Sequence, residues 1–552
     1  MLGSLGSWVN YLTGQSGVAT GTSGIVEVKT GKVRGKRYTF DNGKSVDAFL
    51  GIPYGEGERF KKPIPPKPWT TVLDCTRFGQ RCPHTDLFLE IPFLEAAKSE
   101  NCLNLNVFAP EAAPGPDQPN GYAVMFWVHG GGFTIHSSSH YGDYGICKEL
   151  CTKDVIVVTI NYRLGYFGFL STGDEHCPGN VGLWDQALAL RWVKDNIFEF
   201  GGDPNNITVF GQSAGGASSD YLSLSPHTRD LFQKVIPMAG TAMHSFASIE
   251  TEKNRTKALD FAMKLGFVPN PNATKTETNK AMVQFLNAQP YNKLETALIT
   301  LFGFNLSDQG TLDIVPVMDG DFLPKSIAQL RVEMPKKTVM CGTTKYEGLF
   351  LSFRPHKNAT LGEALQLLET DLRRRGYKVC PELMTKIEEM YFEGKNREDK
   401  RDMTKAVINL ISDFTINWPE TEYAHAMVEL GHTVYQYCFY YCNKRNMGAL
   451  GHAMAFRGAT HCSELTYIFH KGLIANFYPN NDDNKMVKLM TTMWTNFAKY
   501  GNPNGKENEG PWKPLTAEDP YKYFEIDLDS KFKDDVHYGR IKKLRELLIE
   551  YA

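Results

Sequence analysis

Residues 207–217 read Ile207-Thr-Val-Phe-Gly-Gln-Ser-Ala-Gly-Gly-Ala217. The apolar and β-branched start is typical of a short buried strand, and the small residues after Ser213 are typical of a closely packed helix start. Between them lies the pattern Gly-x-Ser-x-Gly, from Gly211 to Gly215, in which a strand turns sharply into a helix and exposes a serine hydroxyl. The pattern alone is weak evidence, because chance supplies it in roughly one chain of this size in five. The surrounding sequence must therefore decide its meaning.

Strand-like and helix-like segments alternate on both sides of this stretch. We predict strands at Ala123–Val128, Val155–Ile160, Ile207–Phe210, Thr338–Cys341 and Thr433–Tyr441, and a helix at Gly182–Ile197. This alternation predicts an α/β fold with a mostly parallel central sheet and helices on both faces. The stretches 245–335 and 355–430 have largely helical patterns, and we expect them to form cap insertions over one edge of the sheet. No linker rich in Pro, Gly or Ser divides the chain, so we predict a single domain over 21–552 after a flexible segment at 1–20.

The composition argues against several other classes of protein. The 552 residues have a formal net charge of −2, with 42% hydrophobic and 22% charged residues, as in ordinary globular proteins. No basic stripe indicates nucleic-acid binding, and no apolar run approaches the ~20 residues of a membrane-spanning helix. No metal-ligand spacing or dinucleotide fingerprint stands in a convincing context, so we predict neither a metal nor a cofactor. The sequence does not predict an oligomeric state.

A glycine run directly follows the predicted strand at Ala123–Val128 and reads His129-Gly-Gly-Gly-Phe133. Acyl transfer places negative charge on a carbonyl oxygen in the transition state, and backbone N–H groups must face that oxygen without side chains in the way. Gly131 and Gly132 meet this requirement, and the N–H of Ala214 supplies a third donor. Together with the serine motif, the run predicts an oxyanion hole rather than a flexible turn.

A serine hydroxyl is a poor nucleophile at neutral pH, so it needs a histidine to take its proton and a carboxylate to orient that histidine. In this type of fold the chain order is serine, acid, histidine. Glu347 follows the predicted strand Thr338–Cys341, and His461 follows the one at Thr433–Tyr441. Active-site groups collect at such strand ends. We therefore predict Ser213 as nucleophile, Glu347 as acid and His461 as base, although position alone does not single out His461 among fourteen histidines.

The ordered motifs resemble those of the type-B carboxylesterase/cholinesterase family of α/β-hydrolases, from about Gly24 to about Lys513. They are found at Phe49–Tyr54, Glu100–Asn106, His129–Phe133, Asn161–Gly168, Gly179–Gly216, Pro316–Gly320 and Asn502–Asn504. The resemblance implies the α/β-hydrolase fold and the same triad and oxyanion-hole residues. It also implies a small-molecule ester substrate, hydrolysed through an acyl-Ser213 intermediate without a cofactor.

The resemblance further implies a disulfide between Cys82 and Cys102 and a buried structural ion pair of Glu100 and Arg163. Glycine often follows the catalytic histidine in relatives, whereas here it is Cys462. We interpret Cys462 as a packing residue rather than a redox group.

Two departures from the family pattern concern the substrate. Relatives usually carry Glu before the nucleophilic serine, and here the residue is Gln212. Cholinesterases hold choline by a cation–π contact with a tryptophan in the loop that corresponds to residues 82–102. That loop contains Phe88 and Phe93 but no tryptophan. The sequence therefore favours a neutral ester over acetylcholine.

Alternative functions and locations stay open at this stage. The same acyl-enzyme serves an acyltransferase or a lipase, and some members of the family are non-catalytic adhesion proteins. The N-terminus lacks the basic start and long apolar segment of a secretory signal, which predicts a cytoplasmic protein. The family's usual secretion and the Asn-x-Ser/Thr sequons favour secretion or peripheral membrane association instead. The sequons begin at Asn206, Asn254, Asn272, Asn305 and Asn358.

Overall fold

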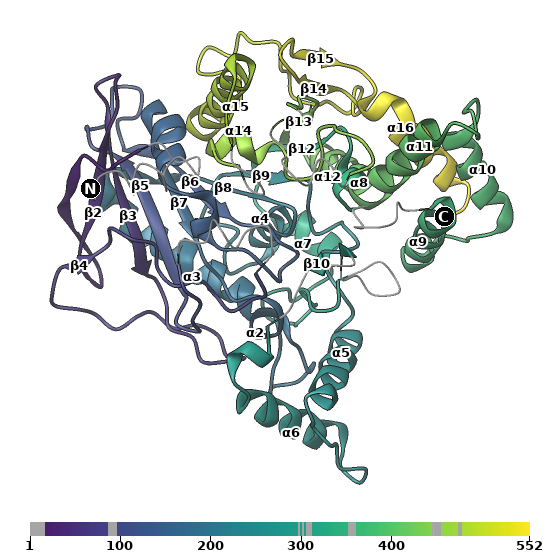
Figure 1. The fold of residues 1–552 in the computed structure, drawn as a ribbon, viewed down its shortest axis with the longest axis horizontal. Helices are drawn as coiled ribbons and strands as arrows, with labels where there is room; N and C mark the ends of the chain where they lie inside the picture. The colour runs from purple at the N-terminus through teal and green to yellow at the C-terminus, as the bar shows by residue number, and fades with distance from the viewer. Residues whose placement is uncertain are drawn as a thin grey trace, which may run out of the picture.

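The computed structural model describes residues 17–86, 96–295, 299–300, 303–304, 312–351, 360–443, 445, 454–472 and 477–552. Its centre is a thirteen-stranded sheet, seen in Figure 1 with helices packed around it. The strands lie in the order β1-β2-β3-β5-β7-β6-β8-β9-β12-β13-β14-β15, and β4 pairs with β2. Their bounds are β1 Gly21–Val28, β2 Gly31–Thr39, β3 Ser45–Pro53, β4 Leu73–Asp74, β5 Asn104–Pro110, β6 Tyr122–Val128, β7 Val155–Ile160, β8 Gly202–Gln212, β9 Lys234–Met238, β12 Thr338–Thr344, β13 Thr433–Phe439, β14 Tyr523–Ile526 and β15 Lys531–Lys533.

Strand direction divides the sheet into a parallel centre and antiparallel margins. The pairs from β7 through β6, β8, β9, β12 and β13 to β14 are parallel. The successive pairs β1–β2, β2–β3, β3–β5 and β5–β7 are antiparallel at one margin, and β14–β15 is antiparallel at the other. This mixed sheet confirms the predicted α/β-hydrolase class.

Strand β6 shows why the centre of the sheet is buried on both faces. Side chains alternate along a strand. Ala123, Met125 and Trp127 accordingly enter one hydrophobic core, while Val124 and Phe126 enter the other. Helices α3 (Val181–Asn196) and α4 (Ala214–Leu224) contribute to the core around Val124, and α14 (Leu465–Phe469) and α15 (Asn481–Tyr500) contribute to the core around Met125. A parallel sheet covered on both faces requires such continuous apolar strands.

The predicted elements are confirmed, and the differences lie at their ends. The strand predicted at Ile207–Phe210 is longer in the structure, because its pairing with β6 extends back to Gly202. Strand β13 ends two residues earlier than predicted, at Phe439, and helix α3 begins one residue earlier, at Val181.

Both stretches for which helical patterns were predicted contain helices, and the first also contains the short strands β10 (Ile299–Thr300) and β11 (Gly303–Phe304). In the first lie α5 (Thr251–Lys264), α6 (Lys275–Asn287) and α7 (Ile327–Glu333), and in the second lie α9 (Leu361–Arg374), α10 (Pro381–Phe392), α11 (Lys400–Ser412) and α12 (Trp418–Glu429). Helices α9, α10 and α11 share a separate hydrophobic core with the C-terminal helix α16 (Arg540–Ile549). Figure 1 shows these four helices together at one end of the molecule, away from α5 and α6.

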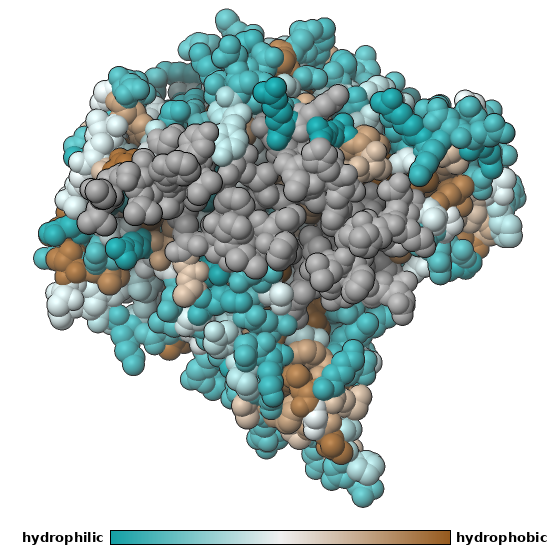
Figure 2. Space-filling view, viewed as in Figure 1, coloured by the Kyte–Doolittle hydropathy of each residue, from teal (hydrophilic) through white to brown (hydrophobic). Residues whose placement is uncertain are grey.

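The face drawn in Figure 2 is mainly hydrophilic where its residues are described, and its hydrophobic residues lie in small separate groups. The large apolar side chains with the highest exposure, such as Val18, Val268 and Val332, come from distant parts of the sequence. Among the described residues, no helix has both the length and the apolar character needed to cross a membrane.

One edge of the parallel sheet gathers the predicted site residues. Strand β6 ends at Val128 before the glycine run, β8 ends at Gln212 before Ser213, and β12 ends at Thr344 before Glu347. Since the carboxyl ends of parallel strands lie at the same edge, these three loops meet there.

Candidate active site

Ser213 lies in the turn between β8 and α4, with φ 58° and ψ −123°. A residue other than glycine with positive φ costs about 1–3 kcal/mol and persists only where its surroundings hold it in place. Here the Ser213 N–H donates to the carbonyl of Met238 at 2.8 Å, and the Ser213 carbonyl accepts from the Ala217 N–H at 2.9 Å. The Ser213 side chain is half-buried between buried neighbours. The structure therefore contains the strand–turn–helix arrangement that the motif predicts.

The two glycines of the motif stand where backbone segments approach closely. A Cβ atom at Gly211 would lie 2.3 Å from the carbonyl oxygen of Gly215, and one at Gly215 would lie 2.1 Å from that of Val128. Non-bonded carbon atoms pack at about 3.5–4.0 Å. A larger residue at either position would therefore push α4 away from the sheet and displace Ser213.

The glycine run after β6 lies directly against Ser213. A Cβ atom at Gly130 would come within 3.3 Å of the Cβ of Ser213. Gly131 and Gly132 have φ values of 106° and 59°, which side-chain-bearing residues rarely adopt. Within the described part of the chain, the N–H groups of Gly131 and Gly132 donate to no carbonyl. The N–H of Ala214 is the first of α4 and lacks an intrahelical acceptor. The N–H groups of all three predicted oxyanion donors are thus without a carbonyl acceptor among the described residues.

His129, at the start of this run, holds the loop in place. Its Nδ1 lies 2.8 Å from the carbonyl oxygen of Gly130, which can only accept, so Nδ1 carries the proton. The hydroxyl of Tyr162 donates to the carbonyl of His129 at 2.8 Å. Burial lowers the pKa of His129 to about 3, so the ring is neutral and its role is structural.

Glu347 and His461 are in direct contact. Nδ1 of His461 lies 2.6 Å from Oε2 of Glu347, and the exposed fractions of the two residues are 6% and 0%. The other carboxylate oxygen of Glu347 accepts from the N–H of Thr344 at the end of β12. Burial disfavours the charged ring, but Cys462 and the Glu347 carboxylate together raise the pKa of His461 well above its ordinary value. Because Nδ1–H donates to Glu347, Nε2 is the nitrogen left to accept a proton.

The residues next to Ser213 and His461 also contact one another. The thiol of Cys462 donates to Oε1 of Gln212 at 3.0 Å. Nε2 of Gln212 lies 3.3 Å from Nε2 and 3.4 Å from Nδ1 of His461. Cys462 packs against a hydrophobic core, as we expected from the sequence, and in addition makes this polar contact. Sequence reasoning missed the contact, since no local pattern relates positions 212 and 462.

Comparisons with known proteins agree with this geometry. The model described as the carboxylesterase family matches residues 22–543. The chain is 39% identical to esterase cest-33 of Caenorhabditis elegans over 98% of this chain and 96% of that protein. It is 32% identical to juvenile hormone esterase of Tribolium castaneum, over 90% and 86% of the two chains, and 30% identical to carboxylesterase 3B of Mus musculus, over 95% and 90%. The chain belongs to the carboxylesterase family.

Membership in this family confirms the resemblance that the sequence motifs indicated. The matched residues include every described strand except the first residue of β1, and the three similar esterases align with the chain over 86% or more of their own length. This carboxylesterase is therefore an enzyme that hydrolyses carboxylic ester bonds, and the comparisons do not favour a non-catalytic or acyltransferase function.

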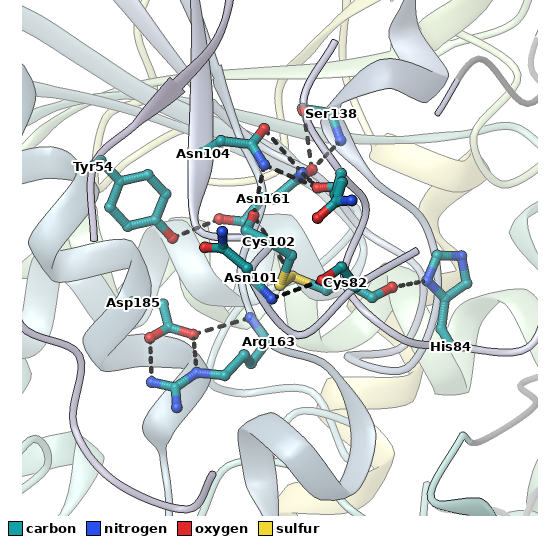
Figure 3. The surroundings of a disulfide bond; sticks show 12 residues. Tyr54, Cys82, His84, Asn101, Cys102, Asn104, Ser138, Asn161, Arg163 and Asp185 are labelled. Atoms are coloured by element: carbon teal, nitrogen blue, oxygen red, sulfur yellow. Dashed lines mark hydrogen bonds and ion pairs between the residues drawn. A yellow bond between two sulfur atoms is a disulfide. The ribbon is translucent and has the colours of Figure 1, made fainter. Parts of the chain in front are cut away.

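In this carboxylesterase Cys82 and Cys102 form a disulfide, and the other nine cysteines are not disulfide-bonded. Figure 3 shows how neighbouring side chains support the two half-cystines. His84 Nδ1 donates to the carbonyl of Cys82 at 2.7 Å, and the side-chain amide of Asn104 donates to that of Cys102 at 3.0 Å. In the chain-entropy model, closing a loop of this length stabilises the fold by about 3 kcal/mol.

The ion pair of Glu100 and Arg163 that the resemblance implied is wrong. Arg163 instead forms a buried two-bond ion pair with Asp185 of α3, at 2.6 and 2.8 Å, as seen in Figure 3. Another N–H of the Arg163 guanidinium donates to the carbonyl of Glu58 at 2.7 Å. Because these acceptors already use the guanidinium, Glu100 pairs with Arg59.

Two further buried glutamates lie near Glu347, and sequence reasoning missed both. Glu464 stands three residues after His461, and Glu420 lies in α12; neither has exposed surface. Burial, followed by the charge of Glu347, raises the pKa of Glu464 to about 8 and that of Glu420 well above its ordinary value. Glu464 is therefore mostly protonated at pH 7. We call Glu347, Glu420 and Glu464 the carboxyl cluster; Glu347 is the member that contacts His461.

The Glu464→Gln variant tests the protonation of this cluster through stability. The pKa of Glu464 in the folded chain, about 8, exceeds the ~4.3 of an unfolded chain. The protonated Glu464 side chain contributes its full stabilisation below pH ~4.3, and this stabilisation is lost as the pH rises through about 8. Glutamine keeps the neutral shape at every pH, so the variant should gain in Tm relative to the natural chain as pH rises, by roughly 2–4 °C at pH 9.

Thermal unfolding at several pH values gives this comparison directly. The exposed Glu518 provides the matched control, because Glu518→Gln should show no Tm difference that grows with pH. A Tm difference for Glu464→Gln that is constant or shrinks between pH 5 and 9 would show that Glu464 is ionised in the folded chain.

Proposed function

We propose that this carboxylesterase works by two-step acyl transfer, with Ser213 as nucleophile, His461 as base and Glu347 as acid. The observation that carries the proposal is the 2.6 Å contact between buried Glu347 and His461, beside the strained turn that presents Ser213. A serine on such a turn, an acid-oriented histidine and a glycine loop without side chains are together the parts that acyl transfer requires.

Each group has a defined part in the first step. Nε2 of His461 takes the proton of the Ser213 hydroxyl as its oxygen attacks the ester carbonyl. Glu347 keeps the proton on Nδ1 and stabilises the imidazolium that forms. The N–H groups of Gly131, Gly132 and Ala214 donate to the negative oxygen of the tetrahedral intermediate.

The second half returns the enzyme to its starting state. His461 gives its proton to the leaving alcohol, and an acyl group remains on Ser213. A water molecule then attacks this acyl group while His461 takes one of its protons. The acid departs and Ser213 regains its proton, so the protein's own residues complete the cycle.

We further propose that the substrates are neutral esters. Gln212 is 1% exposed and brings an uncharged amide to the side of His461, at a position where relatives usually carry a carboxylate. A cationic alcohol group therefore finds no negative charge from this residue. Phe88 and Phe93, in the loop where cholinesterases carry a tryptophan, lie outside the described residues.

Replacement of Ser213 tests the nucleophile. Ser213→Ala should lower the rate of p-nitrophenyl acetate hydrolysis by about 10⁴-fold or more, because no other hydroxyl lies on the turn. An organophosphate should label Ser213 in the natural chain, as read by peptide mass spectrometry, and should leave the variant unlabelled. Hydrolysis at the natural rate by a folded Ser213→Ala protein, with an unchanged Tm as control, would remove Ser213 from the mechanism.

A pair of esters with the same acyl group tests the substrate proposal. We expect kcat/KM for a neutral alkyl ester to exceed that for the corresponding choline ester by about tenfold or more, since Gln212 is uncharged and residues 82–102 contain no tryptophan. Gln212→Glu should narrow this ratio by favouring the cationic ester. A natural enzyme that prefers the choline ester would contradict the proposal.

For the cellular location we propose the secretory route rather than the cytoplasm. Disulfides such as Cys82–Cys102 persist in oxidising compartments and are rare in the cytosol. The sequons differ in their accessibility. Asn254 has no exposed surface and Asn206 is half-buried, whereas Asn272 is exposed between α5 and α6. Asn305 and Asn358 lie outside the described residues.

This difference predicts a specific glycosylation pattern. Chain expressed through the secretory pathway should carry glycan on Asn272 and none on Asn206 or Asn254, because the side-chain amide of Asn254 is held by buried carbonyls of Phe169 and Val315. Glycopeptide mass spectrometry reads the pattern, with Asn272→Gln as the control. An unmodified Asn272 in secreted, active enzyme would contradict it.

A further inference from the structure

We propose that Gln212 and Cys462 form a positioning pair, in which the thiol holds the amide and the amide holds the ring of His461. The contacts are the 3.0 Å hydrogen bond from the Cys462 thiol to Gln212 Oε1 and the close approach of Gln212 Nε2 to both ring nitrogens of His461. Because the thiol donates to Oε1, the amide nitrogen is the end that faces the imidazole. The pair thus ties the turn at Ser213 to the loop of His461, and it rests on the function proposed above.

The two ring distances show that the amide does not compete with Ser213. Nε2 of Gln212 lies 3.3 Å from one ring nitrogen of His461 and 3.4 Å from the other. An atom on the lone-pair direction of His461 Nε2 would lie much farther from Nδ1 than from Nε2. The amide nitrogen therefore lies over the ring or beside Cε1, and the lone pair of Nε2 stays free for the serine proton. The amide limits the movement of the ring without occupying its reactive nitrogen.

Charge explains why an amide serves this position. The ring of His461 faces Glu347 and Cys462, with Glu464 on its own loop and His244 in the segment after β9. Glu420 adds another carboxyl behind Glu347. A glutamate at position 212 would bring a further carboxyl group into this buried region, where like charges repel strongly. Gln212 contacts the ring through its amide nitrogen without adding a charge.

Backbone geometry shows that the thiol is retained against a local cost. Cys462 has φ 71°, in the left-handed region that glycine adopts without strain. Glycine would fit this backbone better than cysteine does. Strain of this kind is kept where the side chain contributes something that the surroundings require. Here the side chain supplies the donor that fixes the orientation of the Gln212 amide.

A double-mutant cycle tests the pair in the full-length enzyme. Gln212→Met keeps the length of the side chain without the amide, and Cys462→Ala removes the thiol while keeping the Cβ atom. Each should lower kcat by about tenfold with little change in KM, because the ring loses its orientation rather than its substrate. The double variant should also lose about tenfold rather than a hundredfold, since both changes break one connected contact. Cys462→Ser should recover most of the loss, because its hydroxyl also donates.

Two controls separate positioning from folding. Cys462→Gly relieves the positive φ, so its Tm should rise while kcat falls as in Cys462→Ala. Cys380, half-buried at the start of α10, provides the matched cysteine control, and Cys380→Ala should keep kcat within twofold. A Cys462→Gly variant with the kcat of the natural enzyme would overturn the proposal. A double variant whose fold-loss in kcat equals the product of the two single fold-losses would also overturn it.

The pH profile supplies a readout that packing alone does not move. Gln212→Glu places a carboxyl group against the ring, so the acid limb of kcat/KM should shift to higher pH by about one unit. An unchanged acid limb would show that position 212 does not face His461, and would overturn the proposal.

Labelling of Ser213 by an organophosphate distinguishes this proposal from the proposed function. Complete but slower labelling in the Gln212 and Cys462 variants means that the triad operates and the pair positions it. Labelling of these variants at the rate of the natural enzyme contradicts the positioning role of Gln212 and Cys462 and leaves the proposed triad intact. Absence of labelling in the natural enzyme contradicts the triad itself.

Discussion

The site depends on how closely α4 approaches the strands at the turn of Ser213. The positions of Gly211 and Gly215 leave no space for a Cβ atom, since the carbonyl oxygens of Gly215 and Val128 stand within 2.3 Å of where it would lie. This contact forces the backbone at Ser213 into a strained conformation, and hydrogen bonds to Met238 and Ala217 hold it there. The Ser213 hydroxyl and the N–H of Ala214 belong to one rigid turn, so the proposed nucleophile and the proposed oxyanion donor cannot move independently.

Electrostatics sets the second constraint, because the carboxyl groups near the triad are buried together. In a region of low dielectric, a second negative charge beside Glu347 is costly, and this neighbourhood raises the pKa of both Glu420 and Glu464. Glu347 contacts His461, on which the proposed acyl transfer forms an imidazolium. The uncharged Gln212 adds no further carboxyl group to this region.

The chemistry at the strand ends could be predicted from the sequence because it is encoded locally. The turn at Ser213, the glycine run at Gly131 and the apolar strands each depend on residues close together in the chain, and the structure contains all of them. Pairings between distant segments were less predictable. Glu100 pairs with Arg59 rather than with Arg163. The guanidinium of Arg163 binds Asp185 and the carbonyl of Glu58 instead, and no local sequence pattern indicates these acceptors.

The carboxyl cluster and the Gln212–Cys462 contact belong to this second kind of feature, and hydrogen bonds between loops explain their precision. The N–H of Tyr346 donates to the carbonyl of Ala459 at 2.9 Å, and the N–H of Phe350 donates to the hydroxyl of Thr460 at 2.8 Å. The loops that carry Glu347 and His461 are therefore bonded to each other on either side of the acid–base contact. Among the described residues, no backbone hydrogen bond joins the loop of His461 directly to the turn of Ser213, and there the side chains of Gln212 and Cys462 meet. This side-chain contact connects the proposed base to the turn that carries the proposed nucleophile.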